Sequence, residues 1–442
     1  MASRPLAALC LAALHRGAVA LSARAAARGG AEAGHERHGL DLWRGLQQQA
    51  PSLEMFCRPS TLSVGTVRYC KYNETQKCPV SRMPAGSSFM VFPGGRTRCI
   101  SNDIPHYAFQ VLPGSSDKLM LFFDGGGACW NKLTFDVGAC DKQFVYPMPR
   151  EGLLSSQDAN PFANYTKVYV QYCTGDLHSG DVLQPYKDKA KRPVEQRGYH
   201  NTRSAVDWAL ANMAPELESL VLLGQSAGAI GTQVWASKLL REFKYKRASI
   251  IADSYAGVFP DGFQGPVFKT LGVCDLDILT AEMKAKCSAK NITISDAYDE
   301  AMKEFPNVAF ANLQSKYDVE QIGFYQKAAL SIGRFGDMQV SKDQFAQKIH
   351  DVLKRYSKNE NYVSFLKPTQ QHVYSICNKV FRTSANVDGA EHRLSDWLSQ
   401  FNAADSRPIR SVCEDSKQDT VFCDVSLAQK TFTPKAHYQL RQ

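Results

Sequence analysis

The sequence lacks the features that mark most specialised protein classes. After the first residues, no apolar run reaches the roughly 20 residues that a membrane-spanning helix needs, so we expect no membrane span. The 442 residues contain no internal repeat and no low-complexity tract. With 44% hydrophobic and 21% charged residues, the composition excludes a disordered, collagenous or coiled-coil chain. What remains is a folded globular protein with a large core.

The net charge of the chain is also small for its length. The formal net charge of +9 includes four arginines that precede the first acidic residue, Glu32. Phosphate binding needs lysine and arginine clustered on one face. The one basic run, 187–192, contains Asp188, and we expect it to be a solvated loop. We therefore expect no nucleic-acid partner.

Cysteine is abundant, but metal-binding cysteine motifs are missing. None of the 13 cysteines forms a C-x-x-C pair, which argues against zinc-ribbon and thioredoxin-like sites, so no metal and no cofactor are expected. Cys10 lies in the leader, and the even number that remains favours disulfides in an oxidising compartment. Their connectivity does not follow from sequence. Plausible local pairs are Cys129 with Cys140, Cys274 with Cys287 and Cys413 with Cys423.

The N-terminal region has the pattern of a secretory signal. Arg4, an apolar stretch over 6–14 and small residues over 18–20 match its charged, apolar and cleavage regions. An organelle transit peptide is the alternative, because the leader is rich in arginine. Three N-x-T sequons also fit a secreted or lumenal protein. They begin at Asn73, Asn164 and Asn291.

Beyond the leader, short apolar runs alternate with helix-like stretches. We expect a signal peptide over 1–28, a flexible segment over 29–50 and a single domain over 51–442 with a cysteine-rich extension over 51–100. Strands are predicted over 118–123, 167–172, 220–223, 249–252, 307–313 and 362–366, and helices over 202–213, 227–240, 321–332 and 394–401. The alternation predicts an α/β fold with a mainly parallel sheet covered on both faces.

One motif carries chemistry. Gly224-Gln225-Ser226-Ala227-Gly228 matches G-x-S-x-G between a predicted strand and a predicted helix. Small residues suit a tight turn that exposes the serine hydroxyl at a helix N-terminus, where free amides favour developing negative charge. The alternative is a glycine-rich helix start in a nucleotide-binding fold, but no G-x-G-x-x-G or G-K-[ST] motif accompanies it. Ser226 is therefore predicted to be a nucleophile.

A nucleophilic serine needs hydrogen-bond donors for the oxyanion of its tetrahedral intermediate. The amide after the serine, that of Ala227, is one candidate. A glycine-rich loop follows the earlier strand over 118–123, and Gly126 or Gly127 supplies the second amide. A simple tight turn is the alternative explanation for these glycines.

The general base and its orienting acid are expected in the order Ser, then Asp or Glu, then His. Among the later histidines, His372 alone lies a few residues beyond a predicted strand. Asp318 follows the strand over 307–313, with Glu320 as a close competitor, whereas Asp253 comes one strand early. The other histidines after the serine are His350, His392 and His437.

These motifs together resemble the pectin acetylesterase and Notum family. The similarity runs from about 107 to 401 and includes Asp253-Ser254 and His372. Its longer motifs are LMLFFDGGGACWN (119–131), YCTGDLHSG (172–180), NTRSAVDWAL (201–210), GQSAGAIG (224–231), QSKYDVEQ (314–321) and LSDW (394–397). The resemblance implies an α/β-hydrolase fold and removal of O-acyl groups by a serine triad. The matching triad positions are Ser226, Asp318 and His372, and Gly126, Gly127 and Ala227 match the oxyanion hole.

The chain also departs from the family pattern. Gln225 and Ala229 replace a serine and a glycine of many members, and Gln371 replaces a small residue before the histidine. Ala128 follows the glycines where many members have an aromatic residue, so acyl specificity does not transfer. The Asp176 and His178 motif lacks a third metal ligand at suitable spacing, and we expect it to structure its loop.

The expected function is that of a secreted serine esterase acting on an acylated carbohydrate, with removal of O-acetyl groups from a polysaccharide such as pectin. One alternative is a deacylase of a lipidated protein or lipid ester, which needs an apolar pocket. Phe259, Phe263 and Phe268 are candidates to line it. The other alternative is a non-catalytic binding protein on the same fold.

Overall fold

A computed structural model describes residues 66–101, 106–142, 146–403, 408–417, 419–424, 427 and 430–433. The predicted signal peptide (1–28), the flexible segment (29–50), Cys57 and His437 lie outside these residues. No helix in the described ranges is long and apolar enough to cross a membrane.

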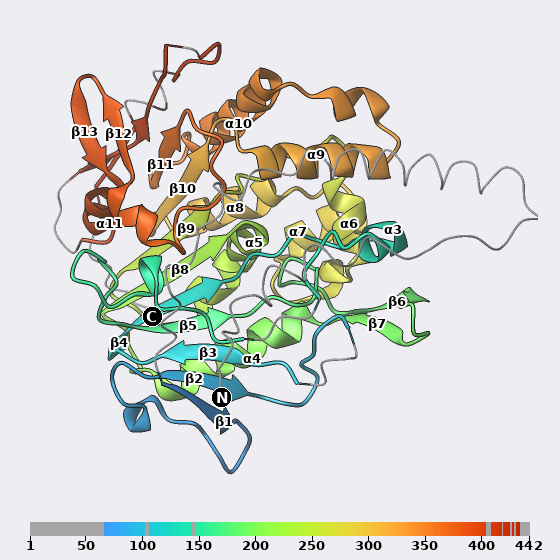
Figure 1. The fold of residues 1–442 in the computed structure, drawn as a ribbon, viewed down its shortest axis with the longest axis vertical. Helices are drawn as coiled ribbons and strands as arrows, with labels where there is room; N and C mark the ends of the chain where they lie inside the picture. The colour runs from blue at the N-terminus through green and yellow to red at the C-terminus, as the bar shows by residue number, and fades with distance from the viewer. Residues whose placement is uncertain are drawn as a thin grey trace, which may run out of the picture. The chain divides into compact units, whose positions relative to one another are not determined.

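The main sheet has ten strands in the described part of the chain (Figure 1). All pairs from β5 across to β15 are parallel, whereas β3 runs antiparallel to both of its neighbours. This confirms the predicted mainly parallel sheet. In spatial order the strands are β1 (Val67–Lys71), β2 (Ser88–Phe92), β3 (Phe109–Leu112), β5 (Tyr165–Val170), β4 (Ser115–Phe123), β8 (Ser219–Gln225), β9 (Ala248–Asp253), β10 (Ala309–Ser315), β11 (Tyr362–Lys367) and β15 (Val412–Cys413).

Helices cover both faces of this sheet. Alternate residues of β8 point to opposite sides: Leu220 and Leu222 join one core cluster, and Val221 and Leu223 join the other. The first cluster contains residues of α4 (Gly198–Asn212), α5 (Ala227–Glu242), α8 (Ile294–Glu304) and α10 (Lys342–Tyr356). The second contains residues of α11 (Leu394–Phe401). Because both faces are buried, the central strands read as continuous apolar runs.

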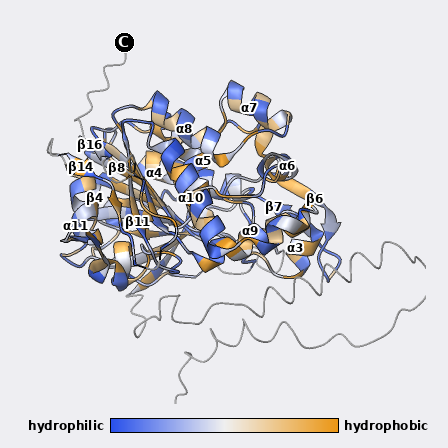
Figure 2. Ribbon diagram, turned by 90° about the horizontal axis from the view of Figure 1, so that it is seen from above, coloured by the Kyte–Doolittle hydropathy of each residue, from blue (hydrophilic) through white to orange (hydrophobic). Residues whose placement is uncertain are grey.

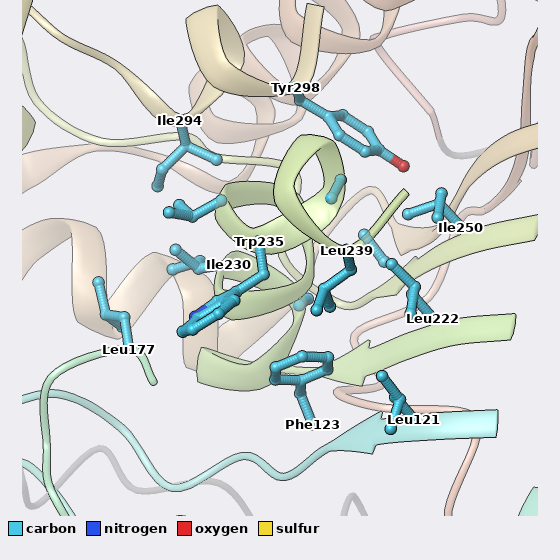
Figure 3. Close-up of a cluster of buried hydrophobic side chains, with 14 of the residues drawn as sticks. Leu121, Phe123, Leu177, Leu222, Ile230, Trp235, Leu239, Ile250, Ile294 and Tyr298 are labelled. Atoms are coloured by element: carbon cyan, nitrogen blue, oxygen red, sulfur yellow. The ribbon is translucent and has the colours of Figure 1, made fainter. Parts of the chain in front are cut away.

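Helix α5 lies at the centre of the first cluster. Figure 3 shows Trp235 and Leu239 of α5 between the strand residues Phe123 and Leu222 and the α8 residue Tyr298. In Figure 2 the central strands are mainly hydrophobic, whereas α10 carries many hydrophilic residues. The helix that begins at the candidate serine is thus fixed by the core on several sides.

The predicted elements of the central sheet are confirmed, with shifted ends. The helix predicted from 202 begins at Gly198, and the strand predicted from 307 begins at Ala309. Sequence patterns did not predict the edge strands β1 to β3 or the hairpin of β6 (Val182–Lys187) and β7 (Pro193–Gln196). Lys187 of the basic run ends β6, and residues 188–192 form the turn of this hairpin, in agreement with the predicted solvated loop.

Disulfides tie the loops to this sheet. The three predicted local pairs are all formed. The described residues add Cys70–Cys78 and Cys99–Cys173, and Cys377 is disulfide-bonded as well. The Cys99–Cys173 bond joins residues 74 positions apart and links the N-terminal strands to the end of β5. These bonds confirm the prediction that the cysteines form disulfides.

Candidate active site

The turn between β8 and α5 places Ser226 in a strained backbone conformation. Its φ is 52° and its ψ is −122°, a region that costs a residue with a side chain about 1–3 kcal/mol. A Cβ atom at Gly224 or Gly228 would overlap a backbone carbonyl oxygen, so both positions require glycine. The turn is thus the tight strand-to-helix elbow that the motif predicts.

Further contacts fix Ser226 at the helix N-terminus. Its amide donates to the Asp253 carbonyl oxygen (2.9 Å), and its own carbonyl oxygen accepts from the Ala229 amide (3.0 Å). The first amides of α5 have no partners within the helix, and the helix dipole adds positive potential there. The position suits an oxygen on which negative charge develops.

Asp318 and His372 lie in direct contact. Asp318 follows β10 and caps α9 (Val319–Ser331), and His372 follows the neighbouring strand β11. Asp318 Oδ2 lies 2.8 Å from His372 Nδ1, and both side chains are buried. Burial alone would lower the pKa of His372, but the charge and the hydrogen bond of Asp318 outweigh it and raise the pKa. Since a carboxylate accepts, Nδ1 carries the proton, and Nε2 is left as the basic atom.

All three candidates follow parallel strands, so they occur at one edge of the sheet. Ser226 follows β8, Asp318 follows β10 and His372 follows β11, in the spatial order β8-β9-β10-β11. The carboxyl ends of parallel strands are where open α/β sheets bind ligands. Residues from distant parts of the sequence thereby follow strands at the same edge of the sheet.

Asp253, the alternative candidate for the triad acid, makes structural hydrogen bonds instead. Its Oδ2 accepts from the amides of Tyr374 (2.8 Å) and Ser375 (2.7 Å). Its carbonyl oxygen accepts from the Ser226 amide, so Asp253 ties the serine turn to the segment that follows His372. The adjacent Ser254 Oγ accepts from the Val373 amide (2.8 Å). Sequence reasoning missed this link, although the Asp253-Ser254 pair was among the family motifs.

Glu320, the other competitor, lies in the first turn of α9. Among the described hydrogen bonds, none joins it to His372, whereas Asp318 makes that contact. Burial raises the pKa of Glu320, and the charge of His372 opposes the rise. Glu320 therefore interacts with His372 through its charge, whereas the hydrogen bond to His372 Nδ1 is made by Asp318.

The glycine loop after β4 lies against the serine turn. A Cβ atom on Gly125 would come within 3.0 Å of the Ser226 Cβ. Gly126 and Gly127 have φ values of 142° and 70°, which favour glycine. In the described ranges, the amides of Gly126, Gly127 and Ala227 donate no backbone hydrogen bond. Three amides without a backbone partner therefore occur in the loop beside the serine turn and directly after the serine.

Aromatic side chains extend from this region. Tyr255 stacks on Phe259 at 5.1 Å, and Phe259 stacks on Phe263 at 5.2 Å. Phe263 meets the edge of Trp130 at 5.1 Å, and Trp130 follows Gly127 by three residues. Phe268, the third predicted lining residue, is buried in α6 (Gln264–Thr270). Phe259 and Phe263 thus belong to an aromatic row that reaches the glycine loop.

Metal-binding clusters are not found among the described residues, in which no three His, Cys, Asp or Glu side chains form a group that could hold an ion. His178 has Asp124 O as the partner of its Nε2, and Asp176 accepts from Thr174 Oγ1 and the Gly198 amide. These two residues therefore hold loops together.

Comparison with known proteins assigns the chain to a family. The Pectinacetylesterase family model matches residues 96–414. Pectin acetylesterase 5 of Arabidopsis thaliana is 26% identical over 205 residues, which are 43% of this chain and 47% of that protein. The palmitoleoyl-protein carboxylesterase NOTUM of Schmidtea mediterranea is 28% identical over 34% of this chain and 29% of its own. The chain thus aligns with about half or less of these curated relatives.

A solved structure shares the fold. The Wnt deacylase Notum from Drosophila, in crystal form I, superposes with a TM-score of 0.50 at 15% identity, over 70% of this chain and 92% of its own. This similarity agrees with the α/β-hydrolase fold predicted from sequence. Because the family model covers most of the sequence, the chain belongs to the pectinacetylesterase family.

Proposed function

We propose that this chain is a serine carboxylic-ester hydrolase that removes O-acetyl groups from a polysaccharide such as pectin. The observation that carries the proposal is the buried Asp318–His372 hydrogen bond at the sheet edge that also holds the strained Ser226 turn. The names of the pectin acetylesterases and carboxylesterases among its relatives support the reaction class.

The first half of the reaction forms an acyl enzyme. His372 Nε2 takes the Ser226 hydroxyl proton as Oγ attacks the ester carbonyl carbon. The carbonyl electron pair moves to oxygen, and the amides of Gly126, Gly127 and Ala227 stabilise the resulting oxyanion. As the oxyanion collapses, the bond to the sugar oxygen breaks, and the imidazolium gives its proton to the departing alcohol.

The second half frees the enzyme by the same groups. His372 takes a proton from water, and the hydroxide adds to the acyl carbon to form a second tetrahedral intermediate. Collapse breaks the bond to Ser226 Oγ, which regains its proton, and the carboxylic acid leaves. Asp318 keeps the proton on Nδ1 and stabilises the imidazolium in both halves.

A second candidate is favoured by the aromatic row. Tyr255, Phe259 and Phe263 stack in series, and Phe263 makes an edge contact with Trp130, which follows the glycine loop. A pocket lined by these rings would favour long acyl chains, because each buried CH₂ contributes roughly 0.8 kcal/mol. A deacylase of a lipidated protein or lipid ester therefore remains the alternative substrate class.

An acyl-chain series distinguishes these candidates. The purified protein is assayed on p-nitrophenyl acetate, butyrate and octanoate, and on acetylated pectin. We expect the highest kcat/KM on acetate and release of acetate from pectin. A preference for octanoate would replace the polysaccharide deacetylase with the lipid deacylase. Folded protein without activity on any ester would favour the non-catalytic binding protein.

The secretory route is a separate proposal with its own test. Asn73, Asn164 and Asn291 are all exposed, so an oligosaccharide transferase can reach their sequons. We expect protein secreted from animal cells to lose mass on treatment with peptide N-glycosidase. Each Asn→Gln change should remove one glycan, whereas Asn386→Gln, at an exposed asparagine outside a sequon, should change nothing. Unmodified protein with six or more titratable thiols would contradict the secretory route.

A further inference from the structure

The segment 172–180 contacts both ends of the glycine loop that follows β4. Tyr172 at its start and His178 near its end stack on each other, with ring centroids 4.6 Å apart. Both side chains are 1% exposed. Because both side chains are buried next to the glycine loop, their hydrogen bonds show how they act on the conformation of this loop.

His178 binds the start of the loop. Its Nε2 lies 2.8 Å from the Asp124 carbonyl oxygen, which can only accept, so Nε2 carries a proton. Burial lowers the pKa of His178 to about 4, and the ring is therefore a neutral donor near neutral pH. The His178 carbonyl oxygen in turn accepts from Trp235 Nε1 (3.0 Å) and Thr202 Oγ1 (3.2 Å). Helices α5 and α4 thus hold the histidine in place.

Tyr172 binds the other end of the loop. Its hydroxyl donates to the Gly127 carbonyl oxygen (3.0 Å) and accepts from the Leu177 amide (2.9 Å). Leu177 and His178 both have a φ of 61°, an uncommon value for residues with side chains. The hydroxyl therefore connects the loop to a turn whose strained conformation brings the histidine back onto the tyrosine ring.

These contacts matter because three consecutive glycines have little conformational preference of their own. A trans peptide unit directs its C=O and N–H in opposite directions. The Asp141 amide binds the Gly126 oxygen (2.8 Å), which directs the Gly127 amide to the other side. His178 binds the Asp124 carbonyl oxygen, in the peptide unit that carries the Gly125 amide, and Tyr172 binds the Gly127 carbonyl oxygen, in the unit that carries the Ala128 amide. The two residues thus anchor the peptide units at both ends of the glycine stretch, and the Gly126 and Gly127 amides lie between these anchors.

We propose that Tyr172 and His178 are positioning residues that hold the glycine loop in the one conformation that presents the Gly126 and Gly127 amides to the oxyanion. This inference rests on the proposed function, because an oxyanion forms only if Ser226 attacks an ester. Both side chains are buried, so we expect neither of them to contact the substrate. We therefore expect these residues to stabilise the transition state, and so to affect kcat, without changing substrate binding.

The test removes one hydrogen bond at a time. Tyr172→Phe and His178→Phe keep the rings and remove the donors. We expect kcat on p-nitrophenyl acetate to fall about 10- to 100-fold with KM unchanged, below the 10²- to 10³-fold loss for deleting a donor itself. The affinity of a boronic acid, which forms a tetrahedral anionic adduct with the serine, should fall by the same factor. His178→Gln, which restores an N–H donor, should recover part of the loss.

A matched control separates positioning from stability. Tyr362→Phe removes a buried hydroxyl that donates to Asn312 Oδ1 (2.9 Å) in the same sheet. It should lower the melting temperature and leave kcat and boronic acid affinity unchanged. If folded Tyr172→Phe and His178→Phe keep the wild-type kcat and boronic acid affinity, the positioning role is wrong, whereas the proposed function is unaffected. An inactive wild type, or one as active as Ser226→Ala, would instead overturn the proposed function.

Discussion

Replacing Ser226 with alanine is expected to lower kcat on p-nitrophenyl acetate by about 10⁴- to 10⁶-fold. The change removes the only atom that forms the acyl-enzyme bond, and the residual rate then depends on the oxyanion amides and on substrate binding. Alanine keeps the Cβ atom in the strained turn, where φ is 52°. The melting temperature should therefore stay close to that of the wild type.

The control for this prediction lies on the same helix. Ser237 is a buried serine of α5, and Ser237→Ala should retain wild-type kcat. A fluorophosphonate probe should label the wild type and Ser237→Ala and leave Ser226→Ala unlabelled. Activity and labelling that persist in folded Ser226→Ala would place the nucleophile on another residue.

The central elements of this fold are predictable because their physical causes are local. The strands around β8 are buried on both faces, so each reads as a continuous apolar run. The edge strand β1 has mostly exposed residues, and the β6–β7 hairpin is largely polar, so neither has a strong period. These elements are formed by pairing with neighbours that the sequence pattern does not identify.

The candidate site also has a part that the sequence predicts from local patterns and a part that depends on the order of the strands. Ser226 is predictable because the geometry of its turn requires small residues within four positions. Asp318 and His372 are 54 residues apart, and only the sheet order brings β10 next to β11. Sequence reasoning therefore left Glu320 and Asp253 as competitors for the acid. Their partners in the structure, and not their spacing, separate the three carboxylates.

Replacing Asp318 with asparagine is expected to lower kcat by about 10³- to 10⁴-fold, close to the loss for the equivalent change in other serine triads. Asp318 Oδ1 accepts from the Gln321 amide (3.0 Å), while Oδ2 faces His372 Nδ1. An asparagine that keeps the first bond directs its NH₂ group at Nδ1. The imidazole then carries its proton on Nε2, and Ser226 loses its base.

The pH profile gives an independent check of the same variant. His372 must be neutral to act as a base, so activity falls as the pH drops through its pKa. Burial lowers that pKa, and Asp318 raises it above the ordinary value. Without the carboxylate, burial dominates, and the acid limb of log kcat/KM should move to lower pH while the plateau falls. A loss of activity without this shift would contradict direct pairing of Asp318 with the histidine.

The matched variant is Glu320→Gln, because Glu320 is the nearest competing carboxylate on the same helix turn. Its charge also acts to raise the pKa of His372, after the larger effects of Asp318. We therefore expect kcat within about threefold of wild type and a small shift of the acid limb in the same direction. If Glu320→Gln loses more activity than Asp318→Asn, the acid of the triad is Glu320. The hydrogen bond to Nδ1 would then have to form with Glu320 once substrate is bound.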